Sequence, residues 1–139
     1  MRQHQETLEI RTNGPGLVEF TEAAVRVVEE AGVLTGLTHV FCRHTSASLL
    51  IQENADPDVQ TDLERYFERI VPESRGDYIH TCEGPDDMPA HIRSALSGVQ
   101  LSIPLIASRL ALGTWQGIYL FEHRAMAHRR SVASHLLGE

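Results

Sequence analysis

Apolar and polar residues alternate along several short segments of the chain, and this pattern predicts a series of β-strands. The segment from Thr7 to Thr12 alternates in this way and predicts a strand with one solvated face. Further strands are predicted over residues 36–44, 47–52, 99–103, 109–112, 114–122 and 130–137. Glycine, proline and asparagine at residues 13–16 separate the first strand from the next segment of the chain.

Apolar residues recur at helical spacing in three other segments, which cover residues 17–31, 57–71 and 87–97. Gly32 and Gly98 come after the first and third segments and are expected to end them. The second begins with Asp56 and Pro57, a capping side chain and then a proline at the first helical position. The pattern therefore predicts one α+β domain over residues 1–139, with three helices and a large, mostly antiparallel mixed sheet.

The predicted strand at residues 114–122 is apolar on both faces. Trp115, Tyr119 and Phe121 point to one face, while Ile118 and Leu120 point to the other. Both faces must therefore be covered, and three modest helices leave much of a large sheet open. We expect another copy of the chain to cover the remaining apolar surface, which makes the protein a homo-oligomer.

Composition limits the classes of function. The chain has 139 residues and a formal net charge of −7, so it has no overall basic field for binding a nucleic acid. Its two cysteines, Cys42 and Cys82, form no CxxC pair and indicate free thiols in a reducing compartment. Neither a membrane-spanning apolar run nor a signal-peptide core is present. A cytoplasmic protein with no membrane partner is expected.

A polar stretch, His44-Thr45-Ser46, separates two strands that both have buried character. Strand alternation places His44 on the apolar side with Val40 and Cys42, where an unpaired polar group costs about 1–3 kcal/mol. His44 is therefore either a core histidine bonded to backbone or part of a pocket wall. Thr45 and Ser46 offer hydroxyl and backbone N–H groups for an anion, or simply form an ordinary turn.

A second group of polar residues lies in the irregular stretch from residue 73 to 88 and the helix after it. His80 and His91 flank Glu83, Asp86 and Asp87, which makes a plausible neighbourhood for a divalent metal ion, Zn²⁺ or Mg²⁺. The spacing is not that of a zinc finger or a zincin. One of the two aspartates has an alternative role as the cap of the helix over residues 87–97.

Three more polar residues lie along the aromatic strand or just after it. Gln116, Glu122 and Arg124 share one side of it, so they could reach a pocket from its rim, although for Arg124 simple solvation at the sheet edge is the favoured interpretation. Arg129 and Arg130 are interpreted as solvated charges. A Ser–His hydrolase based on Ser46 or Ser48 is conceivable, but these serines lack the flanking glycines of a nucleophile elbow.

Three stretches of the chain together resemble the YjbQ-like family, whose members are often described as secondary thiamine-phosphate synthases. They are HVFCRHTSASLLIQENADPDVQTDL, YIHTCEGPDDMPAHIRSALSG and LALGTWQGIYLFEHR. The resemblance implies a compact α+β fold on a large mixed sheet, a homotrimer, and a cleft lined by the histidine motifs. It also implies a weak activity that joins a pyrimidine pyrophosphate to a thiazole phosphate with release of pyrophosphate.

The resemblance also implies roles for individual residues. The family positions correspond here to His44, Thr45, Ser46, Ala47, Glu53, Asn54, Asp62, His80, His91, Gln116 and Glu122. In the family loop a histidine precedes the helix histidine, and Pro89 takes its place here. If that histidine is a metal ligand in other members, Glu83, Asp86 or Asp87 must compensate.

These observations lead to one spatial hypothesis: His44, His80 and His91 converge in a pocket around a metal ion or a phosphate. In this hypothesis all three histidines are catalytic and, with Glu83, ligate the metal, and His44 or His80 is the general acid. Thr45, Ser46, Glu53, Asn54, Gln116 and Glu122 are the expected ligand-binding residues. The alternative is a non-catalytic trimer that binds a small phosphorylated metabolite in the same cleft.

Overall fold

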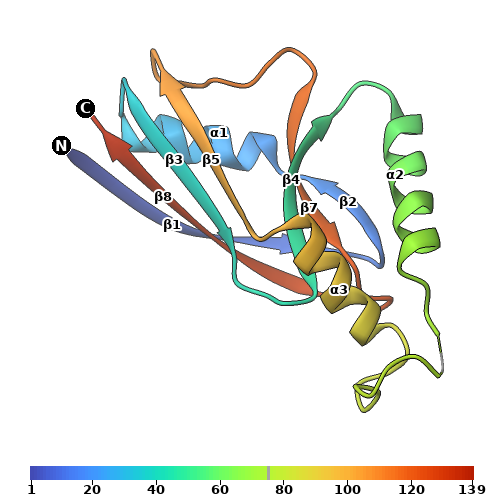
Figure 1. Ribbon diagram of the computed structural model, residues 1–139. Coiled ribbons are helices and arrows are strands. Elements are labelled where there is room, and N and C mark those ends of the chain that lie inside the picture. Colours follow the sequence, from blue (N-terminus) through green and yellow to red (C-terminus); the bar gives the residue numbers. More distant parts are fainter. Residues whose placement is uncertain (75) are drawn as a thin grey trace.

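The computed structural model describes residues 1–74 and 76–139 and contains two antiparallel sheets and three helices (Figure 1). The larger sheet has the strand order β1 (Arg2–Arg11), β8 (Arg129–Gly138), β3 (Gly36–Cys42), β5 (Gln100–Ile106) and β6 (Arg109–Leu110). The smaller sheet has the order β2 (Gly16–Glu19), β7 (Gln116–Glu122) and β4 (Ala47–Glu53). The helices are α1 (Thr21–Ala31), α2 (Pro57–Ile70) and α3 (Asp87–Ser97).

The predicted α+β class and the three helices are confirmed, but the strands divide between two sheets in place of one large mixed sheet. Every ladder between the described strands is antiparallel. The first helix is shorter than predicted, because Leu17 pairs with Phe121 in the ladder between β2 and β7. Its apolar spacing therefore starts inside a strand, and the helix begins only at Thr21.

The hydrophobic core lies between the two sheets and α1. Val40 and Cys42 of β3 belong to one cluster with Ile118 and Leu120 of β7, and Val27 of α1 is part of the same cluster. On the far side of β7, α2 lies against Phe121 and Tyr119: the rings of Phe67 and Phe121 meet edge to face at 5.3 Å, and Gln60 donates to the Tyr119 hydroxyl at 3.2 Å. Trp115, just before β7, is 62% exposed. Both apolar faces of β7 are thus covered within one chain.

Two local features place the site. Ser94 of α3 donates a 2.8 Å hydrogen bond to the carbonyl of Ala47, which ties α3 to the start of β4. The segment before α3 includes position 75, which lies outside the described residues, and it leads from α2 to the lower end of the molecule (Figure 1). His91 of α3 also lies 2.9 Å from the Thr45 carbonyl, so the turn between β3 and β4 lies beside α3. No helix within the described ranges has the length and apolarity needed to cross a membrane.

Candidate functional site

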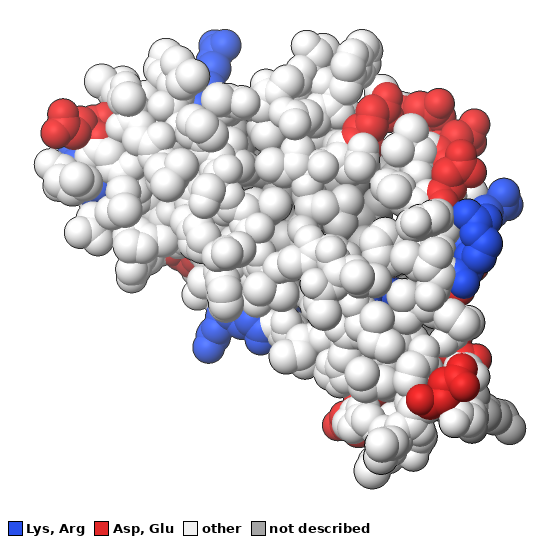
Figure 2. All heavy atoms as spheres, viewed as in Figure 1, with Lys and Arg blue, Asp and Glu red and all other residues white. Residues whose placement is uncertain are grey.

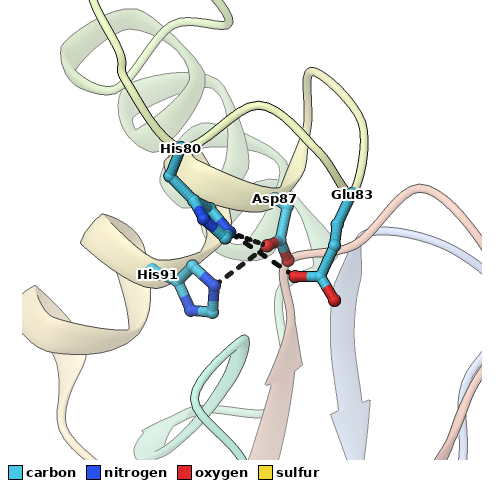
Figure 3. A group of neighbouring side chains, drawn as sticks. All are labelled: His80, Glu83, Asp87 and His91. Carbon is cyan, nitrogen blue, oxygen red and sulfur yellow. Dashed lines mark hydrogen bonds and ion pairs between the residues drawn. The ribbon is translucent and has the colours of Figure 1, made fainter.

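Four potential metal ligands meet at the start of α3. One ligand atom from each of His80, Glu83, Asp87 and His91 lies within 4.8 Å of the others (Figure 3). His80 and Glu83 come from the loop before the helix, while Asp87 and His91 lie one turn apart in α3. The loop and the helix together bring these side chains to one point, which we call the four-residue cluster.

Asp87 is the centre of the cluster. One of its oxygens, Oδ2, lies 2.6 Å from His80 Nε2 and 3.0 Å from His91 Nε2. The Asp87 side chain is only 2% exposed, whereas that of His80 is 42% exposed. The carboxylate is therefore fixed inside the protein, and solvent reaches the cluster from the His80 side.

The hydrogen bonds of His91 determine which ring nitrogen carries its proton. Nδ1 lies 2.9 Å from the carbonyl oxygen of Thr45, which can only accept, so Nδ1 carries the hydrogen. In a neutral ring Nε2 is then an unprotonated nitrogen that faces the Asp87 carboxylate. Two acceptors this close require a positive species between them, either a second proton or a cation. The donor set therefore fits a metal ion.

Arg124 holds the acidic side of the cluster in place. It donates from Nε to Asp86 at 2.9 Å, from one terminal nitrogen to Asp87 Oδ1 at 2.7 Å, and from the other to the carbonyl of Glu83 at 2.9 Å. Because Arg124 occupies Oδ1, the second carboxylate oxygen of Asp87 is turned toward the two histidines. The guanidinium fork fits this multidentate role, which a lysine cannot reproduce.

The electrostatics of the cluster keep Asp87 ionised. Burial raises the pKa of Asp87, but the hydrogen bonds with His80 and Glu83 and the charges of His91 and Arg124 outweigh it and lower the pKa below its usual value. The carboxylate is thus anionic at neutral pH, as a metal ligand must be.

His44 lies apart from the four-residue cluster, in contrast to the predicted convergence of three histidines. Its Nε2 accepts a 2.7 Å hydrogen bond from the backbone N–H of Ser131, and its Nδ1 lies 3.4 Å from the Arg130 guanidinium. Burial and the nearby Arg130 charge both lower the pKa of His44, so the ring is neutral. With Nε2 occupied by a backbone donor, His44 is poorly placed to ligate a metal or to act as a general acid.

His44 does share an open groove with the cluster. The groove measures about 670 Å³ and lies between the β3–β4 turn and α3. Its lining is mainly apolar and includes Phe41, Cys42 and Val99, while His44 and His91 supply polar atoms. Since His91 belongs to both, the groove opens directly beside the four-residue cluster.

Glu122 and Arg130 form a buried ion pair, which corrects two expectations. Glu122 is fully buried, and its carboxylate is already occupied by hydrogen bonds from Arg130 and from Thr12. Arg130 is 3% exposed, and the interpretation of this arginine as a solvated charge is wrong. The pair supports the site indirectly, because Glu122 Oε2 accepts from the backbone N–H of Arg124 at 3.2 Å.

Three other predicted ligand-binding residues lie at the opposite end of β4 and β7. Glu53 pairs with Gln116 at that end, whereas Ala47 pairs with Glu122 at the cluster end, six residues and about 20 Å away. Glu53 accepts from the backbone of Asp56, and Gln116 accepts from the backbone of Gly113. Asn54 comes after Glu53 at the same end. The structure does not bring these side chains to the cluster.

The remaining candidate residues contribute only backbone carbonyls to the site or make no contact with it. Thr45 and Ser46 use their carbonyls, which accept from His91 and Arg130 respectively. Asp62 is exposed on α2. Ser48 lies 2.9 Å from His123 Nε2, but it is fully buried, so the hydrolase alternative has no accessible nucleophile in this pair.

Sequence reasoning underestimated Asp87 and Arg124. Arg124 was considered for the rim of a pocket, but simple solvation was the favoured interpretation. Neither Asp86 nor Asp87 makes a side-chain cap at the start of α3, because Arg124 and the histidines occupy their oxygens. The pair Asp87 and His91, four residues apart at the start of a helix, was the signal available. Arg124 gave no such sequence signal, since it is distant along the chain.

Pro89, at the position where the family has a histidine, is buried in the first turn of α3, where proline is tolerated.

Comparison with known proteins identifies relatives along nearly the whole chain. A family model described as UPF0047 protein YjbQ-like matches residues 6–139. The chain belongs to the YjbQ-like family. A Synechocystis relative, UPF0047 protein sll1880, is 56% identical over 138 residues, which cover 99% of this chain and 94% of the relative. The YjbQ protein of Escherichia coli O157:H7 is 42% identical and covers 98% of this chain and 99% of its own.

Solved structures of the YjbQ-like family share the fold. An uncharacterised member from Clostridium acetobutylicum is 36% identical and superposes with a TM-score of 0.85 over 96% of this chain and 99% of its own. A YjbQ-like protein from Sulfolobus solfataricus is only 22% identical but has a TM-score of 0.86 over 99% of both chains. The arrangement of two sheets and three helices is therefore preserved at low sequence identity.

Proposed function

We propose that His80, Glu83, Asp87 and His91 hold a divalent metal ion and that the protein is a small phosphate- or pyrophosphate-handling transferase. The observation that carries this proposal is the meeting of four ligand atoms within 4.8 Å, with His91 Nε2 turned toward the Asp87 carboxylate. Two imidazoles and two carboxylates suit Zn²⁺ or a similar transition metal. Mg²⁺ prefers oxygen ligands and water, so this donor set favours Zn²⁺ over Mg²⁺.

The neighbouring groove supplies a place for the substrate. A bound ion would neutralise negative charge that develops on a departing pyrophosphate. The chain itself fixes His91 through the Thr45 carbonyl, and the apolar wall of Phe41 and Val99 accommodates the organic part of a phosphorylated compound. His44 shapes this wall as a neutral ring. Weak thiamine-phosphate synthase activity, the activity associated with the family, is consistent with such a site.

Turnover distinguishes this proposal from a non-catalytic trimer that binds a phosphorylated metabolite. The metal-loaded protein is incubated with a pyrimidine pyrophosphate and a thiazole phosphate, and pyrophosphate release is measured. We expect release to depend on the metal and to fall to background in His80→Ala, because this variant lacks one ligand. Binding of the substrates without any metal-dependent release would support the non-catalytic alternative.

Replacing Arg124 tests whether its hydrogen bonds to Asp86, Asp87 and the Glu83 carbonyl position the metal ligands. In Arg124→Lys a single ammonium cannot hold Asp86, Asp87 and the Glu83 carbonyl together. Loss of such supporting partners typically lowers metal affinity by about 10–100-fold. We expect a decrease in this range for Zn²⁺, measured by competition with a chromophoric chelator. Arg129→Lys, at an exposed position, is the control, and equal affinities for the two variants would contradict the positioning role.

We also propose that the chain assembles as a homotrimer through the outer face of the five-stranded sheet. Alternate residues of β3 and β5, including Leu37, Phe41 and Ile106, are exposed there. Figure 2 shows almost no charge over β3 and β5, whereas charged side chains gather over α2. An uncharged apolar face of this kind is a candidate interface.

The oligomer is tested with a charge on that face. Ile106 is 64% exposed, and Ile106→Glu is expected to shift the mass measured by light scattering from trimer to monomer. Ile70→Glu, on the exposed side of α2, serves as the control and should remain trimeric. A monomeric wild-type protein would eliminate this proposal.

A further inference from the structure

Glu122 and Arg130 meet in the interior, and together they contact both segments that support the four-residue cluster. Arg130 donates from Nε to Glu122 Oε1 at 2.8 Å, and one of its terminal nitrogens donates to Glu122 Oε2. Thr12 donates to Glu122 Oε1 at 2.6 Å. The Glu122 carboxylate therefore has a fixed position and orientation, because side chains from β8 and from the end of β1 hold it.

The first support runs from Glu122 through Arg124 to Asp87. Glu122 Oε2 accepts from the backbone N–H groups of His123 and Arg124, at 3.0 and 3.2 Å. These hydrogen bonds fix the backbone where the chain leaves β7, and this backbone sets where the Arg124 side chain begins. Since the Arg124 guanidinium holds Asp87 Oδ1 at 2.7 Å, the position of Glu122 limits where the central carboxylate of the cluster can lie.

The second support runs from Arg130 through the β3–β4 turn to His91. The terminal nitrogen of Arg130 that contacts Glu122 also donates to the carbonyl of Ser46 at 3.2 Å. Ser46 is buried and follows Thr45, whose carbonyl lies 2.9 Å from His91 Nδ1. Arg130 therefore fixes the turn whose backbone orients the His91 ring.

Stability alone gives a weak reason for placing an ion pair here. Taking two charges out of water costs free energy that offsets much of their attraction, and apolar side chains of similar size often stabilise a core equally well. An apolar pair could not, however, accept from two backbone N–H groups and donate to a backbone carbonyl. The polar atoms that distinguish this pair from an apolar core are the atoms that contact the two supports.

We propose that Glu122 and Arg130 are positioning residues, which hold the Asp87 side and the His91 side of the four-residue cluster in register with each other. This inference rests on the metal site proposed above, and it adds that zinc affinity depends on a pair outside the set of ligands. Glu122 acts through Arg124, and Arg130 acts through the backbone of the β3–β4 turn. Because the two charges are joined by a bidentate pair, a change in either member displaces both supports.

Arg130→Lys tests the support that leads to His91. Lysine keeps the charge beside Glu122, but one ammonium cannot bind both carboxylate oxygens and also reach the Ser46 carbonyl. We expect zinc affinity, measured by chelator competition, to fall about tenfold or more, the usual effect of losing a supporting partner of a metal ligand. Leu136→Ala is the matched control. Leu136 is fully buried in the same strand about 20 Å from Arg130, so its loss lowers stability but should leave zinc affinity unchanged.

A spectroscopic measurement on the metal-free protein separates positioning from a general loss of stability. The Nδ1 proton of His91, which the Thr45 carbonyl accepts, is observed by ¹H–¹⁵N NMR. In Arg130→Lys we expect this signal to shift and its exchange with water to become faster, because the turn that carries the acceptor is no longer fixed. In Leu136→Ala the signal should match that of the wild type.

Glu122→Asp tests the support that leads to Asp87, and it decides the question if Arg130→Lys does not fold. Aspartate keeps the charge but is one methylene shorter, so it cannot contact Arg130 and the backbone N–H of Arg124 together. We expect zinc affinity to fall about tenfold. In an Arg124→Lys background the same change should cost less than about threefold, because residues that act through one another are not additive.

Two results would overturn different parts of this account. Equal zinc affinities in Arg130→Lys, Glu122→Asp and Leu136→Ala would overturn the positioning role while leaving the metal site in place. A wild-type protein that binds no zinc would instead remove the metal proposal. The His91 proton then decides the inference: an altered signal in Arg130→Lys supports it, and an unchanged signal overturns it.

Discussion

His91→Ala is expected to abolish tight binding of Zn²⁺. His91 turns its Nε2 toward the cluster, and its other nitrogen is fixed by the Thr45 carbonyl, so alanine removes both the proposed ligand and the link to the β3–β4 turn. Loss of a residue that merely supports a ligand already costs about 10–100-fold in affinity, and loss of the ligand itself should cost more than about 100-fold. Elemental analysis of the purified protein and chelator competition measure the effect. His80→Ala should behave in the same way.

Two other histidines serve as controls for this result. His39→Ala should leave zinc affinity unchanged, because His39 lies on the outer face of the five-stranded sheet, where the trimer contacts are proposed, and outside the four-residue cluster. His44→Ala should also retain zinc, because His44 is engaged by Ser131 and Arg130 and lies outside the cluster. If His44→Ala lost zinc as completely as His91→Ala, the four-residue assignment would be wrong.

Glu122→Gln is expected to lower the free energy of unfolding by about 3–5 kcal/mol, the usual effect of removing one partner of a buried ion pair. Glutamine keeps the shape of the side chain but leaves the Arg130 guanidinium buried without its counter-charge. Chemical denaturation monitored by circular dichroism measures the loss. Glu9→Gln is the matched control: Glu9 lies near Arg129 and Arg11 at the exposed surface, where such pairs contribute about 0–1 kcal/mol.

The difference between the wild type and Glu122→Gln should also depend on pH. Burial alone raises the pKa of Glu122, but the hydrogen bonds from Arg130 and Thr12 and the Arg130 charge outweigh it and lower the pKa below its usual value. A carboxyl group with a lowered folded-state pKa stabilises the protein above its unfolded pKa of about 4.3. That stabilisation is lost as the pH falls through the folded-state pKa. The two proteins should therefore converge in stability in acid, and a constant difference down to pH values well below about 4.3 would exclude the ionised pair as the cause.

The candidate site shows which residues local sequence patterns could identify and which they could not. His80, Glu83 and His91 were identified because they lie within twelve residues of one another, so local spacing alone limits how far apart they can be. His44 was grouped with them by its polarity between buried strands. The structure instead satisfies His44 with the Ser131 backbone, the alternative that strand alternation had left open.

Residues distant along the chain were the ones misjudged. Arg124 and Arg130 looked like solvated charges, since nothing local shows that Asp86, Asp87 and Glu122 would meet them. Gln116 and Glu122 were assigned one role because they share a strand. A strand of seven residues spans about 20 Å, however, and only its Glu122 end approaches the site.

The sequence by itself determined the α+β class, the three helices and the short-range part of the cluster, because hydrophobic periodicity and helix geometry act over a few residues. The tertiary structure alone decided the division into two sheets, the ion pair of Arg124 with Asp87, the burial of the Glu122–Arg130 pair and the hydrogen bond from Arg130 to the Ser46 carbonyl. Most of these depend on contacts between segments that are far apart along the chain. The free energy of such contacts depends on burial and on the relative placement of whole elements, which local patterns do not encode.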